Sequence, residues 1–334
     1  MIKVAAITSG RNVPSSRFRV RQFITPLAEL GIEVTEHYAR PNKYLTRRVW
    51  PLGLLTRLPG LLASRSADIT WLEREMVPGR LTAERFTGGV RILDIDDAIW
   101  MNNQPGASEQ LAAQCKGIIA GNEYIAEHYR QHARRVWVIP TSVDTDRWRP
   151  RQSISHSNKD RWNIGWIGTS SNLPFLQMCE EPLADFLSQH PAARLTVVCD
   201  RPPSLKKIPP ASLQFKRWSE EGEVRLVQDF HVGIMPLPDT DWARGKCALK
   251  MLQYMSVGIP VIASQVGRAR DILGQSEIGV AVETMQGWYD GMTTVYHDRA
   301  LSARMGEAGR ALILDSYSVE KNVIKLAEVF RALL

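Results

Sequence analysis

The sequence predicts an α/β protein made of two doubly wound parallel-sheet domains. Both halves of the 334 residues open with the same order of elements: a short apolar strand, a turn of small residues, a helix and a second strand. This order begins at Val4 in the first half and at Asn163 in the second. A polar linker at residues 148–158 separates the halves. We therefore expect Rossmann-like domains over residues 1–155 and 156–315.

Short apolar runs bounded by glycine, proline or polar residues predict the strands. They start at Val4, Ile32, Ile69, Val90, Gly117 and Val136 in the first half and at Asn163, Ala193, Val232 and Val261 in the second. Apolar residues spaced three and four apart predict helices over residues 18–30, 123–130, 175–189, 250–257, 300–314 and 316–334. The last of these is amphipathic, with one apolar side formed by Val319, Val323, Leu326, Val329 and Leu333.

The excess positive charge lies in the first half of the chain. Residues 1–155 hold 22 Lys and Arg against 15 Asp and Glu, whereas residues 156–334 hold 20 of each, which gives the net charge of +7. A one-sided basic surface favours an anionic partner, such as a phospholipid surface, a phosphorylated substrate or nucleic acid. We expect no nucleic acid partner, because aromatic residues do not alternate with basic ones on a strand. The alternative is that this surface only keeps the protein soluble.

The chain has the features of a cytoplasmic protein. It contains no run of about eighteen apolar residues that could span a membrane. Its first apolar run is too short for a signal peptide. The four cysteines have neither metal-ligand nor redox spacing, which favours a reducing compartment. They are Cys115, Cys179, Cys199 and Cys247.

Segment 45–65 departs from this alternation of strands and helices. It mixes arginines with leucines and a tryptophan and is interrupted by proline and glycine. One interpretation is peripheral contact with the inner face of an anionic membrane. The other is a buried connecting helix whose arginines reach the solvent.

Two turns of small residues follow the opening strands. Ser9-Gly10 ends the first strand of one half, and Gly168-Thr-Ser-Ser ends that of the other. Ligands of open α/β sheets bind at the carboxyl ends of the strands, and a helix N-terminus attracts phosphate. Neither turn matches a dinucleotide or P-loop motif, so each is a weak sign of a binding site.

Three carboxylates, Asp94, Asp96 and Asp97, follow the strand that begins at Val90. They could ligate a metal or accept hydrogen bonds from sugar hydroxyls, or they could form a capped turn with exposed acids. Carboxylates buried together repel, so we expect an arginine such as Arg17 or Arg19 beside them.

The densest pattern of polar residues runs from Trp242 to Gly267. A loop with the sequence Arg-Gly-Lys at 244–246 enters a helix near Ala248. The helix start, Lys246 and Lys250 together form a pattern that would bind a diphosphate. The alternative is a solvated basic helix start. Gln253 lies three residues after Lys250, on the same side of the helix.

At these residues the sequence resembles the family-four retaining glycosyltransferases of bacterial type. Residues 251–267 are similar to that family's donor-site helix and the strand after it, and residues 138–150 to the segment that closes its first domain. Residues 305–310 resemble its C-terminal signature. The resemblance implies the GT-B fold, in which two Rossmann-like domains face a cleft. It also implies that the helix at 316–334 packs back on the first domain.

By this resemblance the first domain binds the acceptor and the second binds a nucleotide-diphosphate sugar, UDP- or GDP-linked. Family members usually carry two glutamates around the donor loop, and here those positions hold Gly245 and Gln253. The donor-binding residues implied are Gly168, Thr169, Ser170, Trp218, Glu220, Arg244, Gly245, Lys246, Lys250 and Gln253. The acceptor-binding residues implied are Gly10, Arg17, Arg19, Asp94 and Asn122, and the catalytic ones Asp96, Asp97 and Lys246.

We therefore expect a hexosyltransferase of polysaccharide biosynthesis. It would transfer a sugar with retention of configuration to a glycan, lipid-linked or other acceptor. It would need no metal or other cofactor, because cations and helix N–H groups stabilise the departing diphosphate. The alternative is a non-catalytic nucleotide-sugar or polysaccharide-binding protein on the same scaffold, since both family glutamates are missing.

Overall fold

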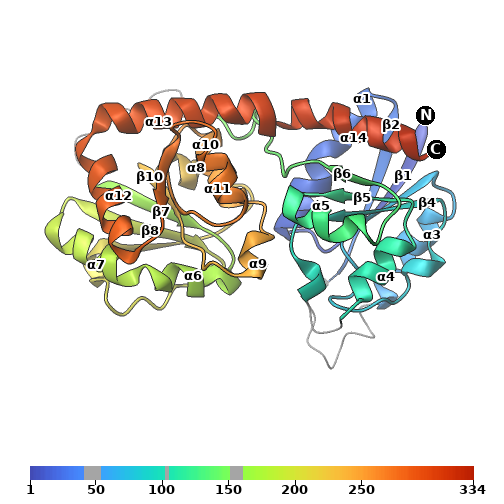
Figure 1. Ribbon diagram of the computed structural model, residues 1–334, viewed down its shortest axis with the longest axis horizontal. Coiled ribbons are helices and arrows are strands. Elements are labelled where there is room, and N and C mark those ends of the chain that lie inside the picture. The colour runs from blue at the N-terminus through green and yellow to red at the C-terminus, as the bar shows by residue number, and fades with distance from the viewer. Residues whose placement is uncertain (41–53, 102–104, 151–160) are drawn as a thin grey trace. The chain divides into compact units, whose positions relative to one another are not determined.

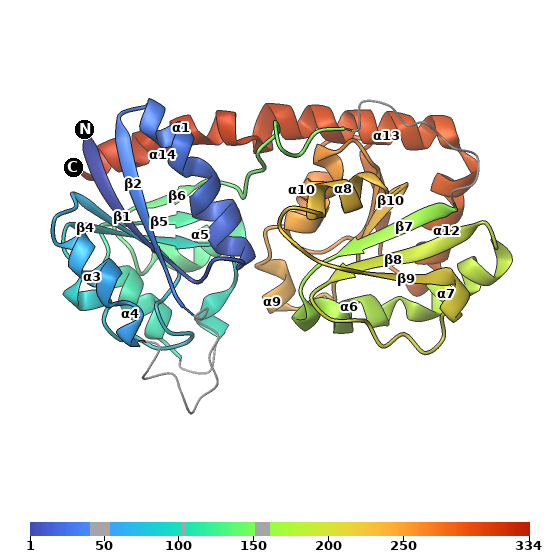
Figure 2. The ribbon, with the colours of Figure 1, turned by 180° about the vertical axis from the view of Figure 1, so that it is seen from behind.

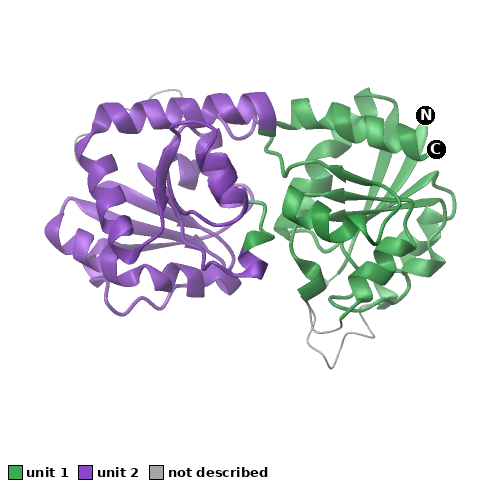
Figure 3. Ribbon diagram, in the orientation of Figure 1, with its two compact units in different colours: residues 1–144, 244–247, 317–334 green, residues 145–243, 248–316 purple. Residues whose placement is uncertain are grey.

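The computed structural model describes residues 1–40, 54–101, 105–150 and 161–334. The chain forms two compact units (Figure 3). Unit 1 consists of Met1–Asp144, Arg244–Cys247 and Tyr317–Leu334, and unit 2 of Thr145–Ala243 and Ala248–Ser316. The domain boundary expected at residue 155 lies outside the described residues, and residues 145–150, expected in the first domain, belong to unit 2. Residues 244–247, expected in the second domain, belong to unit 1.

Unit 1 contains a six-stranded parallel sheet with the order β2-β1-β3-β4-β5-β6 (Figure 1). Its strands are β1 (Ile2–Thr8), β2 (Ile32–Tyr38), β3 (Ile69–Glu73), β4 (Val90–Ile95), β5 (Gly117–Ala120) and β6 (Val136–Val138). Neighbouring apolar residues point to opposite faces: Leu93 packs in one core and Ile92 in the other. Both faces are buried, which explains the nearly continuous apolar strand sequences.

Helices cover both faces of this sheet. They are η1 (Ser16–Val20), η2 (Arg21–Phe23), α1 (Ile24–Glu29), α3 (Leu58–Ser64), η3 (Glu84–Phe86), η4 (Ile99–Met101), α4 (Ala107–Ala113), α5 (Glu123–Arg130) and α14 (Val319–Leu333). Seen from behind, α1 and α14 lie side by side, with both termini of the chain in this unit (Figure 2). The single helix predicted over residues 18–30 is wrong. Pro26 has no N–H for the carbonyl of Gln22 and interrupts the α-helical pattern there.

The amphipathic helix predicted at the C-terminus is confirmed as α14. Its five predicted apolar residues are all buried in the core of unit 1. It begins at Val319, later than predicted, because the Ser318 side chain caps the helix by accepting from the Lys321 N–H. A π-helical turn, η7 (Ile313–Tyr317), precedes it.

Unit 2 contains a second six-stranded parallel sheet, with the order β12-β11-β10-β7-β8-β9. Its strands are β7 (Trp162–Ile167), β8 (Ala193–Cys199), β9 (Leu213–Arg217), β10 (Val232–Met235), β11 (Val261–Ser264) and β12 (Gly279–Val282). The predicted class, two doubly wound parallel sheets, is thereby confirmed. The edge strands β9 and β12 were not predicted, because both are short and only partly buried.

The helices of unit 2 lie on both faces of its sheet. They are η5 (Ser170–Asn172), α6 (Leu173–Met178), α7 (Glu180–Gln189), η6 (Pro210–Ser212), α8 (Glu223–Gln228), α9 (Asp241–Arg244), α10 (Leu249–Ser256), α11 (Arg268–Leu273), α12 (Met285–His297) and α13 (Arg299–Leu312). The single helix predicted over residues 175–189 is broken at Cys179, since Pro182 cannot donate to the preceding turn.

Close packing in unit 2 requires glycine inside two strands. A Cβ at Gly165 would lie 1.9 Å from the Phe230 ring, and one at Gly233 would lie 2.3 Å from the Tyr254 ring. Both rings therefore pack flat against the backbone of the sheet. Residues 305–310, which resemble a C-terminal signature, also serve packing in unit 2. Gly306 lets α13 approach the backbone of Gly258, and Arg310 donates a hydrogen bond to the carbonyl of Ser256.

The described part of segment 45–65 contains a connecting helix, α3, which agrees only in part with the buried-helix interpretation: Gly60 and Ser64 are buried and Arg65 is exposed. Arg57 is buried and donates to the carbonyls of Thr8 and Met76, so it does not reach the solvent. Leu55, Leu58 and Leu62 are exposed. Residues 45–53 of this segment lie outside the described residues.

Candidate functional site

The carboxyl end of β7 brings Gly168 and Lys250 together in unit 2. A Cβ at Gly168 would lie 2.7 Å from Cε of Lys250, so the glycine leaves room for the lysine side chain. The Lys250 ammonium lies 5.5 Å from the centre of the Trp166 ring, at cation–π distance. Two residues predicted separately thus form one basic position at the edge of the sheet.

The turn after Gly168 is fixed by an aspartate at the end of β8. The Ser170 N–H and hydroxyl donate to the two carboxylate oxygens of Asp200, at 2.7 and 2.8 Å. Partial burial of Asp200 acts to raise its pKa, but the hydrogen bonds from Ser170 have the larger combined effect. The pKa of Asp200 is therefore lowered. Thr169 accepts from the Asn172 side chain within the same turn. These hydrogen bonds connect the turn to the end of β8.

Trp218 and Glu220 follow β9 at the same edge of the sheet. The Trp218 indole donates to Glu223, whose carboxylate is buried and also accepts from Arg147. The Glu220 carbonyl accepts from Arg147 as well. Trp218 is therefore held by Glu223, a residue outside the predicted set.

The start of α10 has an unusual backbone. Ala248 precedes the helix with φ at 56°, in the left-handed region that residues other than glycine rarely adopt. Lys250 lies in the first turn of this helix and is half-buried. Gln253 lies on its buried side, and Arg244 is exposed at the end of α9.

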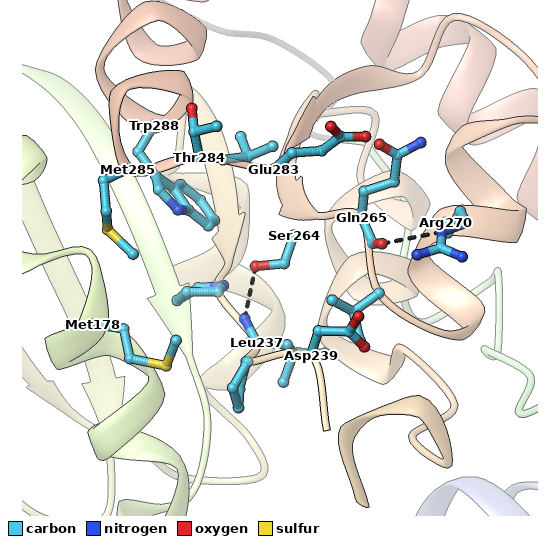
Figure 4. Close-up of a pocket in the computed structure, with 14 residues that line it drawn as sticks. Met178, Leu237, Asp239, Ser264, Gln265, Arg270, Glu283, Thr284, Met285 and Trp288 are labelled. Atoms are coloured by element: carbon cyan, nitrogen blue, oxygen red, sulfur yellow. Dashed lines mark hydrogen bonds between the residues drawn. The ribbon is translucent and has the colours of Figure 1, made fainter. Parts of the chain in front are cut away.

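A pocket of about 350 Å³ lies at the carboxyl ends of β10, β11 and β12 (Figure 4). Trp288, Met178 and Met285 form its apolar side, and Asp239 and Glu283 contribute carboxylates. A hydrogen bond of 2.9 Å from the Leu237 N–H to the Ser264 hydroxyl connects the loop after β10 to the end of β11. None of the predicted site residues lines it.

At the edge of the unit 1 sheet, a buried glutamate organises the loop after β1. One oxygen of Glu73 accepts from the Ser9 N–H at 2.7 Å and the Ser16 hydroxyl at 2.9 Å. Ser16 in turn accepts from the Gly10 N–H at 3.2 Å. The other Glu73 oxygen is buried without a hydrogen bond. Gly10 thus lies in a loop shaped by a carboxylate that the sequence did not single out.

The expectation that an arginine lies beside the carboxylates is confirmed for Arg19. Its Nε donates to Asp94 at 2.8 Å, and its NH1 donates to the Ile139 carbonyl. Burial raises the pKa of Asp94 to about 6, against the opposing effect of Arg19. Both side chains are buried, so neither Arg19 nor Asp94 presents an open group for the acceptor-binding role expected of it. Arg17 is also buried, beside the Phe18 ring.

Asp96 and Asp97 are held by a second arginine. The Arg74 guanidinium binds Asp96 at 2.6 Å and Asp97 at 2.7 Å. The Lys246 ammonium lies 3.7 Å from the other oxygen of Asp97. All three predicted catalytic residues therefore cluster within unit 1.

Asn122 connects segment 244–247 to the rest of unit 1. Its oxygen caps α5 by accepting from the Ile125 N–H, and its amide nitrogen donates to the Gly245 carbonyl at 3.0 Å. A Cβ at Gly245 would lie 2.6 Å from Cβ of Ala98. A glutamate, which the resemblance implies as the usual residue at 245, does not fit unless the backbone moves.

The four cysteines are free and buried, and burial raises their pKa values. The pKa of Cys199 rises to about 11, and that of the other three to about 12. The thiols stay protonated at neutral pH, so their chemistry is that of core residues.

Besides Glu223, which lies in α8, three residues that shape these edges were absent from the prediction: Glu73, Arg74 and Asp200. Each of these three lies at or just past the carboxyl end of a strand. A search for charged residues at strand ends would have found them, since ligands of parallel sheets bind there. Their partners, however, come from distant parts of the sequence.

Residues 164–298 match the family model described as glycosyl transferases group 1. Apart from residues 244–247, which belong to unit 1, this range lies in unit 2, and it includes Gly168 and Lys250. A sequence search of curated proteins finds no match.

The fold is also similar to those of solved glycosyltransferases. Sucrose-phosphate synthase from Thermosynechococcus elongatus is 14% identical, with a TM-score of 0.74 over 100% of this chain and 99% of that one. WaaG, a glycosyltransferase involved in lipopolysaccharide biosynthesis, is 11% identical, with a TM-score of 0.71 over 98% and 99%. HepE from Anabaena, solved with UDP-glucose, is 14% identical, with a TM-score of 0.69 over 99% and 100%. The fold is GT-B.

Proposed function

We propose that this protein is a glycosyltransferase that uses a nucleotide-diphosphate sugar as donor. The observation that carries the proposal is the family match over residues 164–298, which contains the basic position formed by Lys250 and Gly168. The GT-B fold supports it, although folds of this class also serve other activities. HepE was solved with UDP-glucose, so UDP-sugars are the first donors to test, followed by GDP-sugars.

Unit 2 would bind the donor. Lys250, in the first turn of α10, would neutralise the diphosphate as the bond from the sugar C1 to the phosphate oxygen breaks. Gln253 would accept and donate hydrogen bonds at the ribose, with a neutral amide in place of a carboxylate. The turn at 168–170, fixed by Asp200, would bring backbone close to the phosphates.

Unit 1 would bind the acceptor through Asp96 and Asp97. The acceptor oxygen forms the new bond to the sugar C1 while its proton passes to a phosphate oxygen of the leaving group. We propose retention of configuration, which NMR of the product's anomeric proton would test. An inverted product would contradict this part of the proposal.

The decisive experiment replaces Lys250 with methionine. Turnover of the sugar nucleotide is expected to fall by about two orders of magnitude, as when one donor to a developing oxyanion is lost. Lys207→Met is the matched control, because this lysine is exposed and pairs with Glu181 in the same unit. Unchanged turnover in Lys250→Met would contradict the donor site proposed here.

We also propose that a lipid-linked acceptor brings the protein to an anionic membrane, in the service of polysaccharide synthesis. Leu55, Leu58 and Leu62 lie at helical spacing on or beside α3 and are exposed. The excess of positive charge lies in residues 1–155. Among the described residues, no helix has the length and apolarity to cross a bilayer, so contact would occur at the surface.

Cosedimentation with vesicles tests this surface. Wild-type protein is expected to bind vesicles rich in phosphatidylglycerol and to bind neutral phosphatidylcholine vesicles weakly. A Leu58→Ser, Leu62→Ser variant should lose most of this binding, whereas Ile324→Ser, at an exposed isoleucine of α14, should keep it. Equal binding by both variants would contradict the role of α3.

A non-catalytic sugar-nucleotide-binding protein is the second candidate. It is favoured by Gly245, where a glutamate does not fit without backbone movement. Calorimetric binding of UDP-glucose, together with no transfer or hydrolysis of UDP- or GDP-sugars across a broad acceptor panel, would support this candidate over the enzyme.

A further inference from the structure

Arg74 has a backbone conformation that its residue type disfavours. It directly follows β3 with φ at 59°, in the left-handed region where the Cβ crowds the carbonyl oxygen. Among the described residues, Ala248 is the only other non-glycine residue with a positive φ. The Arg74 N–H still donates to the Asp94 carbonyl at 2.9 Å, so the conformation is fixed by the sheet.

The side chain of Arg74 explains why this conformation is kept. Its guanidinium binds one oxygen of Asp96 at 2.6 Å and one of Asp97 at 2.7 Å. Its Nε also lies 3.7 Å from Glu73 Oε1, the buried oxygen that has no hydrogen bond. One planar cation thus binds two adjacent carboxylates and approaches a third.

The two bound carboxylates differ from the other acids at this edge in their exposure. The side chains of Asp96 and Asp97 are 14% and 19% exposed, whereas that of Asp94 is 2% exposed. A ligand can therefore reach Asp96 and Asp97 while Arg74, itself 10% exposed, holds them from within. This is the arrangement expected of an oriented binding pair rather than of a fold-stabilising ion pair.

We propose that Arg74 is a positioning residue for the glycosyl-transfer reaction: it fixes Asp96 and Asp97 in the orientation that receives the acceptor's hydroxyl groups. This inference rests on the proposed function, which supplies the acceptor. Arg74 itself touches no substrate. Its backbone conformation places the guanidinium beneath both carboxylates, and its planar fork binds each of them at a fixed angle.

The test uses Arg74→Gly. Glycine adopts a φ of 59° without steric strain, so the variant is expected to fold while losing the guanidinium. We expect kcat to fall about a hundredfold, as for misplaced catalytic groups, with the KM for the sugar nucleotide changed by less than about twofold. Guanidinium chloride at about 50 mM should restore at least about a tenth of the lost activity, because the free cation fits the space left by the side chain.

Two further variants test whether the planar guanidinium of Arg74 matters, rather than its charge alone or the loss of any arginine ion pair. Arg74→Lys keeps the charge but not the fork, and is expected to be impaired without rescue by guanidinium. Arg130→Ala removes an arginine that also pairs with two carboxylates, but on the exposed side of α5. This variant should match wild type. Wild-type kcat in Arg74→Gly, or rescue equalled by sodium chloride, would overturn the proposal.

If the wild-type protein turns over no sugar nucleotide, the proposed function fails. The positioning role of Arg74 can then still be tested by a measurement that needs no activity. In protein labelled with ¹³C-aspartate, the carboxyl signals of Asp96 and Asp97 can be assigned with Asp96→Asn and Asp97→Asn variants. These signals should move in Arg74→Gly and return with guanidinium. Signals that do not move would overturn the positioning role of Arg74.

Discussion

The carboxylates at the end of β4, where Asp94 lies within the strand and Asp96 and Asp97 follow it, differ in their surroundings, residue by residue. Asp94 is buried against Arg19 and receives a bond from the Trp71 indole, so it belongs to the interior of unit 1. Asp96 and Asp97 share Arg74 and are partly exposed. Three acids within four positions of the sequence thus divide into one structural residue and two that a ligand can reach.

Replacement of Arg19 by methionine is expected to destabilise the protein in a pH-dependent manner. The folded-state pKa of Asp94, about 6, lies above that of an unfolded aspartate, so its contribution favours folding at low pH and is lost as the pH rises through about 6. Without Arg19 the pKa rises further. Urea unfolding should show a loss of about 3–5 kcal/mol at pH 8 and a smaller loss at pH 5.

Arg21→Met is the control for this measurement. Arg21 binds Glu36 but is partly exposed, so its loss should destabilise less at pH 8. An equal loss of stability at pH 5 and pH 8 in the Arg19 variant would show that Asp94 does not titrate as described.

Gly168→Ala is expected to weaken nucleotide binding. The new Cβ would lie 2.7 Å from Lys250 Cε and equally close to the Trp166 ring, so the lysine must leave its position. A lost hydrogen bond to a charged group corresponds to about 1.5–3 kcal/mol, or roughly a tenfold to hundredfold rise in Kd. Calorimetry with UDP and GDP measures it. Gly274→Ala, where a Cβ meets only ordinary contacts, should bind as wild type does.

At the scale of elements, periodicity located the strands of both sheets better than it located the helices. The predicted strand starts agree with the structure within two residues, and the predicted helix at residues 123–130 coincides with α5. The helices that contain Pro26 or Pro182 are broken. Apolar spacing continues through such a proline, whereas the backbone hydrogen bonds do not.

Stability at the scale of one element can be measured on α14. Leu326 is fully buried in the core of unit 1, whereas Ile324 is exposed on the same helix. Leu326→Ala is expected to lower the free energy of unfolding by about 2–5 kcal/mol, and Ile324→Ala by less than about 0.5 kcal/mol. Chemical denaturation of the two variants gives the comparison. Equal losses would contradict the packing of α14 described here.

For the whole molecule, the mechanism predicts that transfer needs no divalent metal. Lys250 and the N–H groups at the start of α10 would provide the positive charge that a metal otherwise supplies to the departing diphosphate. Turnover in the presence of EDTA should therefore stay within about twofold of the untreated value. A loss of activity restored by Mg²⁺ or Mn²⁺ would show that the cations of the chain are insufficient.

The sequence by itself determined the fold class, most strands and the amphipathic helix α14, because hydrophobic period and turn residues are local properties of the chain. It also located Gly168, Lys250 and the acids at the end of β4. Only the tertiary structure decided which side chains pair. Arg74 reaches Asp96 and Ser170 reaches Asp200 across separations of 22 and 30 residues, and it is Arg19, one of the two arginines expected near the acids, that reaches Asp94 across 75 residues. Such pairs depend on the order of strands in each sheet, which no local pattern specifies, since hydrogen bonds and charges act over distance in space rather than along the chain.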